Sequence, residues 1–394
     1  MGAARDDPRI LRTQLLVGCV VMFAEGFYAT QFFPYAALMV KAMRGDDQVG
    51  WYTGLVYSAA SIGGLFTADP WARACNRFGA RATLTVSLLM SVFLAGCVVF
   101  LSSYWPIVIS MTLRSGLSCN LPVMRTNLRR SYESRKVDDT QAFSLISVAF
   151  GAASVCGPSV GGVLYATGPG LPWAVPNLFA SILFVLALIA VVWGLEDTGV
   201  AARKVGGTGA SLWPIMLLTV MGGGHSYVMT GWELAYPLLA QVPVGEGGEG
   251  WLPADIGMTF VVGSTFLMVF CTVCFAPIAR GIGARNTWYL SWAPCLLVIP
   301  FFPGLIAGLL DRDAPLGFHV RMANYSTQTI VSVLMGSSFV TIQLMINQHV
   351  ATRPDAGTAL ALANGWLTSS QCFVRAVSPV VTGAMFNAGM AGWM

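Results

Sequence analysis

The chain has 394 residues, of which 55% are hydrophobic and only 10% are charged, and its formal net charge is +4. A water-soluble protein of this length carries about twice that density of charge. The composition therefore excludes an ordinary soluble protein. The positive charge is scattered over short loops and forms no basic patch, which argues against a nucleic-acid partner.

Eleven apolar segments are long enough to cross a lipid bilayer, because a span needs roughly 20 mostly apolar residues. They are predicted at 12–40, 51–68, 80–101, 105–127, 141–167, 172–194, 211–241, 254–279, 287–308, 328–350 and 357–389. The first six are expected to form an N-terminal bundle over 1–196. A cytoplasmic linker over 197–210 and a C-terminal bundle over 211–394 follow. The sequence thus predicts an all-α, multi-pass protein of the plasma membrane or an organellar membrane.

Lysine and arginine are concentrated before the first apolar segment and in every second connection after it. Basic residues of membrane proteins remain on the cytoplasmic side of the bilayer. We therefore expect a cytoplasmic N-terminus.

Five ionisable residues lie inside the apolar segments, where an ionised side chain is costly and usually faces a cavity or a partner. They are Glu25, Arg114, His225, Glu233 and Arg375. Two acids with two arginines suggest internal pairing. Either Glu25 or Glu233 is a candidate proton-coupling carboxylate, because burial favours its neutral form and a nearby arginine favours its ionised form. The alternative is a structural ion pair that fixes the register of two helices.

Neutral polar residues in the same kind of segment add candidates for substrate binding. His225 follows three glycines, which weaken a helix locally, and histidine titrates near physiological pH; it could equally be a packing residue. Asn120, Gln31 and Gln343 are candidate hydrogen-bonding residues for a substrate.

The two halves of the chain repeat one another at several positions. Pro158, Gly162 and Gly168 return 221 positions later as Pro379, Gly383 and Gly389, and Phe78-Gly79-Ala80-Arg81 returns as Ile282-Gly283-Ala284-Arg285. A duplicated polytopic protein is built from two similar bundles with a substrate site at their interface. The repeat therefore indicates transport.

The stretch Asn76-Arg77-Phe78-Gly79-Ala80-Arg81 resembles the cytoplasmic loop signature of the major facilitator superfamily. Arg77, Gly79 and Arg81 fit that signature, and Asn76 stands where it has an aspartate. In the family this loop ties neighbouring helices together in one conformation. Asp69 could replace the missing acid, or it could be a simple helix-end charge.

Gly157-Pro158-x-x-Gly161-Gly162 resembles the antiporter motif of the drug–proton antiporter branch of that superfamily, and Pro379 and Gly383 repeat it in the second half. Small residues let two helices approach closely, and proline bends a helix. The residues around Asn120 also resemble the tetracycline-exporter and zinc-induced-facilitator groups.

The resemblance implies two pseudo-symmetric six-helix bundles, so the twelfth span is apparently missing from this sequence. It places Glu25, Arg114, His225 and Glu233 on helices that line a central cavity. The expected function is proton-coupled export of a small organic solute by alternating access, carried out by a monomer. A facilitator or proton symporter of the same fold is one alternative, and a non-transporting sensor or accessory protein is another.

Motifs of enzymes and of metal sites are missing from the sequence. There is no Walker, HExxH or GxSxG motif and there are only three histidines. We therefore expect no enzymatic activity, no cofactor and no bound metal; the expected partners are the solute, protons and the lipid bilayer.

Overall fold

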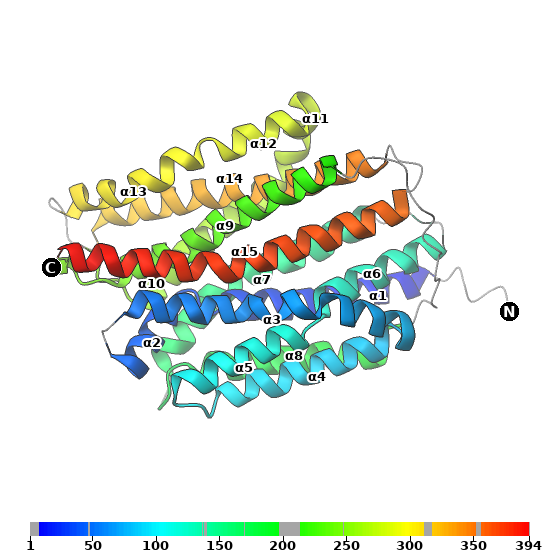
Figure 1. Ribbon diagram of the computed structural model, residues 1–394, viewed down its shortest axis with the longest axis horizontal. Helices are drawn as coiled ribbons and strands as arrows, with labels where there is room; N and C mark the ends of the chain where they lie inside the picture. The colour runs from blue at the N-terminus through cyan, green and yellow to red at the C-terminus, as the bar shows by residue number, and fades with distance from the viewer. Residues whose placement is uncertain are drawn as a thin grey trace. The chain divides into compact units, whose positions relative to one another are not determined.

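The computed structural model describes residues 8–45, 48–135, 137, 140–168, 170–196, 213–246, 248–310, 317–351 and 356–393 (Figure 1). These residues form α-helices and one 3₁₀ turn, η2 (Val244–Glu246), and no strand occurs among them. The helices are α1 (Pro8–Thr30), α2 (Ala36–Arg44), α3 (Val49–Phe78), α4 (Ala80–Val98), α5 (Tyr104–Leu117), α6 (Asn120–Ser134), α7 (Thr140–Thr167), α8 (Ala174–Gly194), α9 (Trp213–Gln241), α10 (Pro253–Val273), α11 (Phe275–Ile282), α12 (Ala284–Trp292), α13 (Cys295–Leu310), α14 (Phe318–Ala351) and α15 (Ala356–Trp393).

Seven helical stretches of the described residues are long and apolar enough to cross a membrane by length and composition. They are Arg9–Thr30, Ala80–Val98, Tyr104–Tyr132, Val148–Thr167, Ala174–Gly194, Pro253–Val273 and Phe318–Ile346. The all-α, multi-pass membrane fold predicted from the sequence is therefore confirmed. The other expected segments lie on α3, α9, α12, α13 and α15, which are helical but fall outside these seven stretches.

Four of the expected spans are not single helices. The segments 12–40, 105–127, 254–279 and 287–308 are each divided into two helices by a proline at or just after the break. Proline lacks an N–H, and its ring collides with the carbonyl four residues earlier. Accordingly α1 ends at Thr30, four residues before Pro34, and α5 ends just before Ser118, four residues before Pro122.

The chain divides into two compact units. The N-terminal unit comprises Met1–Phe32 and Ile62–Arg203, and the C-terminal unit comprises Phe33–Ser61 and Lys204–Met394. Helix α3 thus contributes its first part to the C-terminal unit and its second part to the N-terminal unit. The expected bundles over 1–196 and 211–394 stay a prediction, and most of the linker over 197–210 lies outside the described residues.

The core of the N-terminal unit forms where α1 packs against α6, α7 and α8, and where α4 lies beside α5 and α8 (Figure 1). Phe27, Leu84, Met124 and Phe184 are fully buried there. In the C-terminal unit, α9 packs against α14 and α15, and α10, α12 and α13 pack along α14. A smaller cluster around Ile215, Ile342 and Leu367 fills that core.

Candidate functional site

Glu25 on α1 is buried in the N-terminal unit, and both of its carboxylate oxygens accept hydrogen bonds. Oε2 lies 2.7 Å from Nη2 of Arg114 on α5. Oε1 accepts a bond of 3.0 Å from the hydroxyl of Ser118 and another from Nδ2 of Asn120 at the start of α6. The internal pairing expected from the sequence is thus found for Glu25 and Arg114, and Asn120 joins the same cluster.

The guanidinium of Arg114 is also enclosed by aromatic rings. Its central carbon lies 3.7 Å from the ring centre of Tyr28 and 4.7 Å from that of Phe184. A cation over a ring face is attracted by the ring quadrupole, more strongly where water is excluded. The charge of Arg114 is therefore balanced by a carboxylate and by two rings. Its Nε has no hydrogen-bond partner in the protein.

The break between α5 and α6 brings Ser118 and Asn120 to the carboxylate. Ser118 has an extended backbone, with φ −92° and ψ 122°, because Pro122 cannot donate to its carbonyl. Ser118 was not among the residues nominated from the sequence. The signal that could have found it is the polar stretch Ser118-Cys-Asn120, followed two residues later by Pro122, within an otherwise apolar segment.

Gln31 makes a separate contact. It lies in the turn after α1, is 1% exposed, and its Nε2 donates to Oδ1 of Asn177 on α8 at 3.4 Å. Its Oε1 is buried without a partner. Gln31 thus links α1 to α8 in the N-terminal unit.

The nominated residues of the C-terminal unit lie on three helices: His225 and Glu233 on α9, Gln343 on α14 and Arg375 on α15. His225 is 0% exposed, its ring lies 5.8 Å from Trp292 and 6.1 Å from Phe339, and neither ring nitrogen has a partner in the protein. Glu233 follows eight residues later, about 12 Å along the helix axis, and is half-buried. The positive charge of Arg375 on α15 acts on both residues.

Two further polar residues lie on α14. Gln343 is half-buried, and no described contact joins it to His225. Gln328, which was not nominated, accepts a hydrogen bond of 3.0 Å from the indole N–H of Trp232. Trp232 in turn stacks on Tyr236 at 5.6 Å and meets the edge of Phe302 at 5.4 Å. Asn324 and Gln328 are four residues apart in an otherwise apolar helix, so they lie on the same face of α14. This spacing is the sequence signal that could have found Gln328.

The loop signature adopts a backbone that only glycine accepts readily. Gly79 has φ 86° and ψ 163°, and its repeat Gly283 has φ 80° and ψ 155°. Each glycine precedes a helix, and each carbonyl accepts a bond from the threonine four residues later, Thr83 at 2.7 Å and Thr287 at 2.9 Å. The repeat seen in the sequence is therefore present in the backbone geometry.

The charged residues of that loop have different surroundings. Arg81 donates to the carbonyl of Val192 and so connects α4 with α8. Arg77 is exposed, and its guanidinium lies 5.2 Å from the ring centre of the adjacent Phe78. The side chain of Asp69 lies outside the described residues, so its expected part in a helix latch stays a prediction.

The glycine motif of α7 marks a close helix contact. A methyl group at Gly157 would overlap the hydroxyl of Thr30, and one at Gly161 would overlap the carbonyl of Gln31. Pro158 lies inside α7, and Gly162 beside it is buried. The expected close approach of two helices is found here between α1 and α7.

The repeat of the motif makes the same kind of contact in the C-terminal unit. A methyl group at Gly383 on α15 would overlap the carbonyl of Gly50 on α3, and one at Gly54 would overlap the carbonyl of Pro379. Both halves of the chain therefore use this motif to bring a second helix against the backbone.

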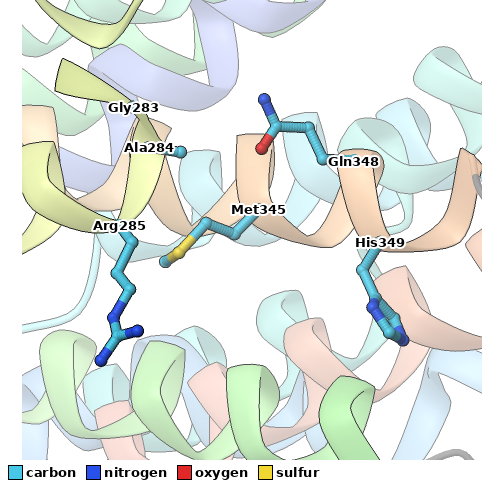
Figure 2. A pocket seen from close by; sticks show the side chains of 6 residues that line it. All are labelled: Gly283, Ala284, Arg285, Met345, Gln348 and His349. Carbon is cyan, nitrogen blue, oxygen red and sulfur yellow. The ribbon is translucent and has the colours of Figure 1, made fainter.

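A surface hollow of about 500 Å³ lies at the second copy of the loop signature. Figure 2 shows the side chains of Arg285 and Met345 close together in this hollow, with His349 further along α14. Its lining is Gly283, Ala284, Arg285, Met345, Gln348 and His349. None of these residues was nominated as a substrate contact from the sequence.

A duplicated, all-helical chain with an ion pair buried in its membrane spans has the features of a polytopic membrane transporter. The sequence profile of the Major Facilitator Superfamily matches residues 15–379. The chain belongs to this superfamily and is a transporter of small solutes.

Individual relatives agree with this assignment. The efflux pump azaK of Aspergillus niger is 24% identical over 407 residues, covering 97% of this chain and 84% of that protein. Protein ZINC INDUCED FACILITATOR-LIKE 1 of Arabidopsis thaliana is 20% identical over 416 residues, covering 95% of this chain and 84% of that protein. The solved structure of a D-xylose-proton symporter has the same fold, with a TM-score of 0.68, 11% identity and 96% coverage of both chains. The resemblance to exporters and zinc-induced facilitators noted in the sequence is confirmed.

Proposed function

We propose that this chain is a proton-coupled exporter of a small organic solute that works by alternating access, and that Glu25 carries the exchanged proton. The observation that carries the proposal is the buried pair of Glu25 and Arg114 inside membrane spans of the N-terminal unit. A buried ion pair contributes little net stability, because desolvation offsets its Coulomb attraction. A functional role for this pair is therefore favoured over a purely structural one.

The contacts suggest how a proton and a solute would compete. Protonation of Glu25 removes the negative charge that holds Arg114, while Ser118 and Asn120 remain able to bond the neutral acid. The same loss of charge releases a solute whose cationic or hydrogen-bond-donating group binds the ionised carboxylate in place of Arg114, so that proton and solute exclude one another. Glu25 is 5% exposed, so proton exchange requires a conformation in which water reaches α1.

Export is favoured over uptake by the antiporter-like motif of α7 and by the relative that is named an efflux pump. The close glycine contact of α7 with α1 joins the motif helix directly to the helix that bears Glu25. The chain is proposed to act as a monomer with its N-terminus in the cytoplasm.

The test is proton flux in proteoliposomes that contain the purified chain, screened with organic cations, zwitterions and anions. Solute-driven proton movement opposite to the solute supports antiport, and movement in the same direction replaces antiport with symport. Solute flux without protons supports a facilitator. Binding of a solute without any flux supports the alternative of a non-transporting sensor or accessory protein.

A further inference from the structure

The connection between α9 and α10 contains a buried acid outside the membrane-spanning helices. Its sequence, Val244-Gly-Glu-Gly-Gly-Glu-Gly-Trp251, is typical of a solvated loop. Glu246 is exposed as that composition suggests, but Glu249 is 0% exposed. Burial of an ionised carboxylate is costly unless it is paired or hydrogen-bonded, so the surroundings of Glu249 decide its state.

Two glycines fold this loop back against the end of α9. The N–H of Gly250 donates to the carbonyl of Val242 and that of Trp251 to the carbonyl of Ala240, both at 2.8 Å. Gly250 has φ +66°, and a methyl group at Gly248 would overlap the carbonyl of Val242. The two residues that flank Glu249 therefore fix a tight turn, and the turn holds the acid inside the protein.

Within the turn, Glu249 contacts Asn324 on α14. Its Oε2 accepts a bond of 2.6 Å from Asn324 Nδ2, which also donates to the carbonyl of Val320 at 3.0 Å. The other oxygen of each group, Oε1 of Glu249 and Oδ1 of Asn324, is buried without a partner. An ionised carboxylate can only accept hydrogen bonds. Two acceptors are thus left without a donor.

We propose that Glu249 is a proton-binding site that closes the α9–α10 loop on α14. A proton taken from solvent onto Oε1 supplies the donor that Oδ1 of Asn324 lacks, and it removes a negative charge from a buried position. Loss of that proton leaves an ion inside the turn, and the loop then opens so that water can solvate the carboxylate. This inference does not depend on the direction or coupling of transport.

The electrostatic surroundings agree with this assignment. Burial raises the pKa of the Glu249 carboxyl from its usual 4.5 to about 7, and the hydrogen bond from Asn324 opposes the rise. Tyr236 on α9 interacts electrostatically with Glu249, and Asp255 at the start of α10 and Tyr325 on α14 interact with Tyr236 in turn. None of these three groups carries a positive charge that would hold Glu249 ionised.

A metal cation is a poorer occupant than a proton. Hard cations such as calcium require six to eight oxygen ligands, and this turn offers one carboxylate and one amide oxygen as unpartnered acceptors. One proton satisfies both of these atoms at once.

The test is hydrogen exchange of the peptide over residues 242–252, measured on the full chain in nanodiscs from pH 5 to 8 in sodium-free buffer. Because the closed carboxyl binds its proton more tightly than the open one, closing is favoured at low pH. The protection of the backbone amides, corrected for the pH dependence of intrinsic exchange, should fall by about tenfold per pH unit up to about pH 7 and then level off. Glu249→Gln should stay protected at every pH, since its amide can both donate to and accept from Asn324. Glu246→Gln, which removes the same charge from the exposed position, should retain the wild-type profile.

A flat wild-type profile overturns the proposal, and so does a Glu246→Gln variant that loses the pH dependence. Protection that rises with sodium at constant pH shows a cation site in place of a proton site. If Glu249→Gln does not accumulate, the wild-type and Glu246→Gln profiles still decide between these outcomes.

Discussion

The carboxylate of Glu25 and the guanidinium of Arg114 form an ion pair of 2.7 Å in which the acid side chain is 6% and the arginine side chain 8% exposed. They come from α1 and α5, which are 89 residues apart along the chain at these positions. Neither charge has bulk water to solvate it, so each depends on the other.

Removal of one member should therefore cost more than removal of both. Arg114→Ala leaves Glu25 buried without its counter-ion and should lower the free energy of unfolding by about 3–5 kcal/mol. The double variant Glu25→Gln with Arg114→Met should recover most of that loss. Thermal unfolding in detergent measures both effects, and equal losses in the single and double variants would contradict the mutual dependence.

Glu25→Gln should separate proton coupling from folding. The amide keeps the size of the side chain and its contacts with Ser118 and Asn120, but it cannot exchange a proton. We expect solute-driven proton movement to be lost when equal amounts of folded variant and wild type are reconstituted, although the unpaired Arg114 lowers the stability of the variant. Glu246→Gln is the control, because it removes an exposed acid of the same type. Normal coupling in Glu25→Gln would remove Glu25 from the mechanism.

His225→Phe should reduce transport without reducing the stability of the protein. The buried ring has no protein partner for either nitrogen, so an apolar ring of similar shape should leave the unfolding temperature unchanged or raise it. Transport should fall, because a proton- or solute-binding nitrogen is lost. Full transport by a stable variant would show that His225 is a packing residue.

Gly157→Ala should loosen the contact between α1 and α7. The added methyl group overlaps Thr30, so we expect a loss of about 1–3 kcal/mol. Gly151→Ala on the same helix has open space around the new methyl group and should be neutral or slightly stabilising. Unfolding curves of the two variants measure the difference, and equal stabilities would contradict close packing at Gly157.

Gly79→Ala and Gly283→Ala should each be destabilising for a reason that does not involve packing. Both glycines have positive φ with extended ψ, a region nearly restricted to glycine, where another residue costs about 1–3 kcal/mol. Gly283 has open space around an added methyl group, and so has Gly281, which has no positive φ. A Gly281→Ala variant as unstable as Gly283→Ala would show that backbone strain is not the cause.

The sequence was sufficient for features that follow from local chemistry. Charges inside apolar segments must find partners, so a pairing of Glu25 or Glu233 with an arginine was predictable. The repeat of Gly79 at Gly283 was also visible in the sequence, and the structure adds that both residues have a positive φ. The choice of Arg114 as partner for Glu25 depends on which helices pack together, and no local pattern contains that information.

Other features were missed because tertiary contacts reverse a local tendency. Glu249 lies among glycines and another acid, so its composition indicates a solvated loop; the turn against α9 and the amide of Asn324 bury it instead. The break at Ser118 was overlooked because the hydropathy of 105–127 is that of one span. Pro122 is the physical cause of the break, because it cannot donate a hydrogen bond to the carbonyl of Ser118. The break in turn determines which side chains reach Glu25.

Under the proposed function, the ion pair of α1 and α5 would also determine how a transport step responds to voltage. An ionised Glu25 with Arg114 has no net charge, so movement of the pair through the electric field of the membrane does no work. A proton on Glu25 leaves the charge of Arg114 uncompensated, and displacement of one charge is worth about 2.3 kcal/mol per 100 mV. The proton-loaded step would then be driven by the membrane potential, whereas the unloaded step would not.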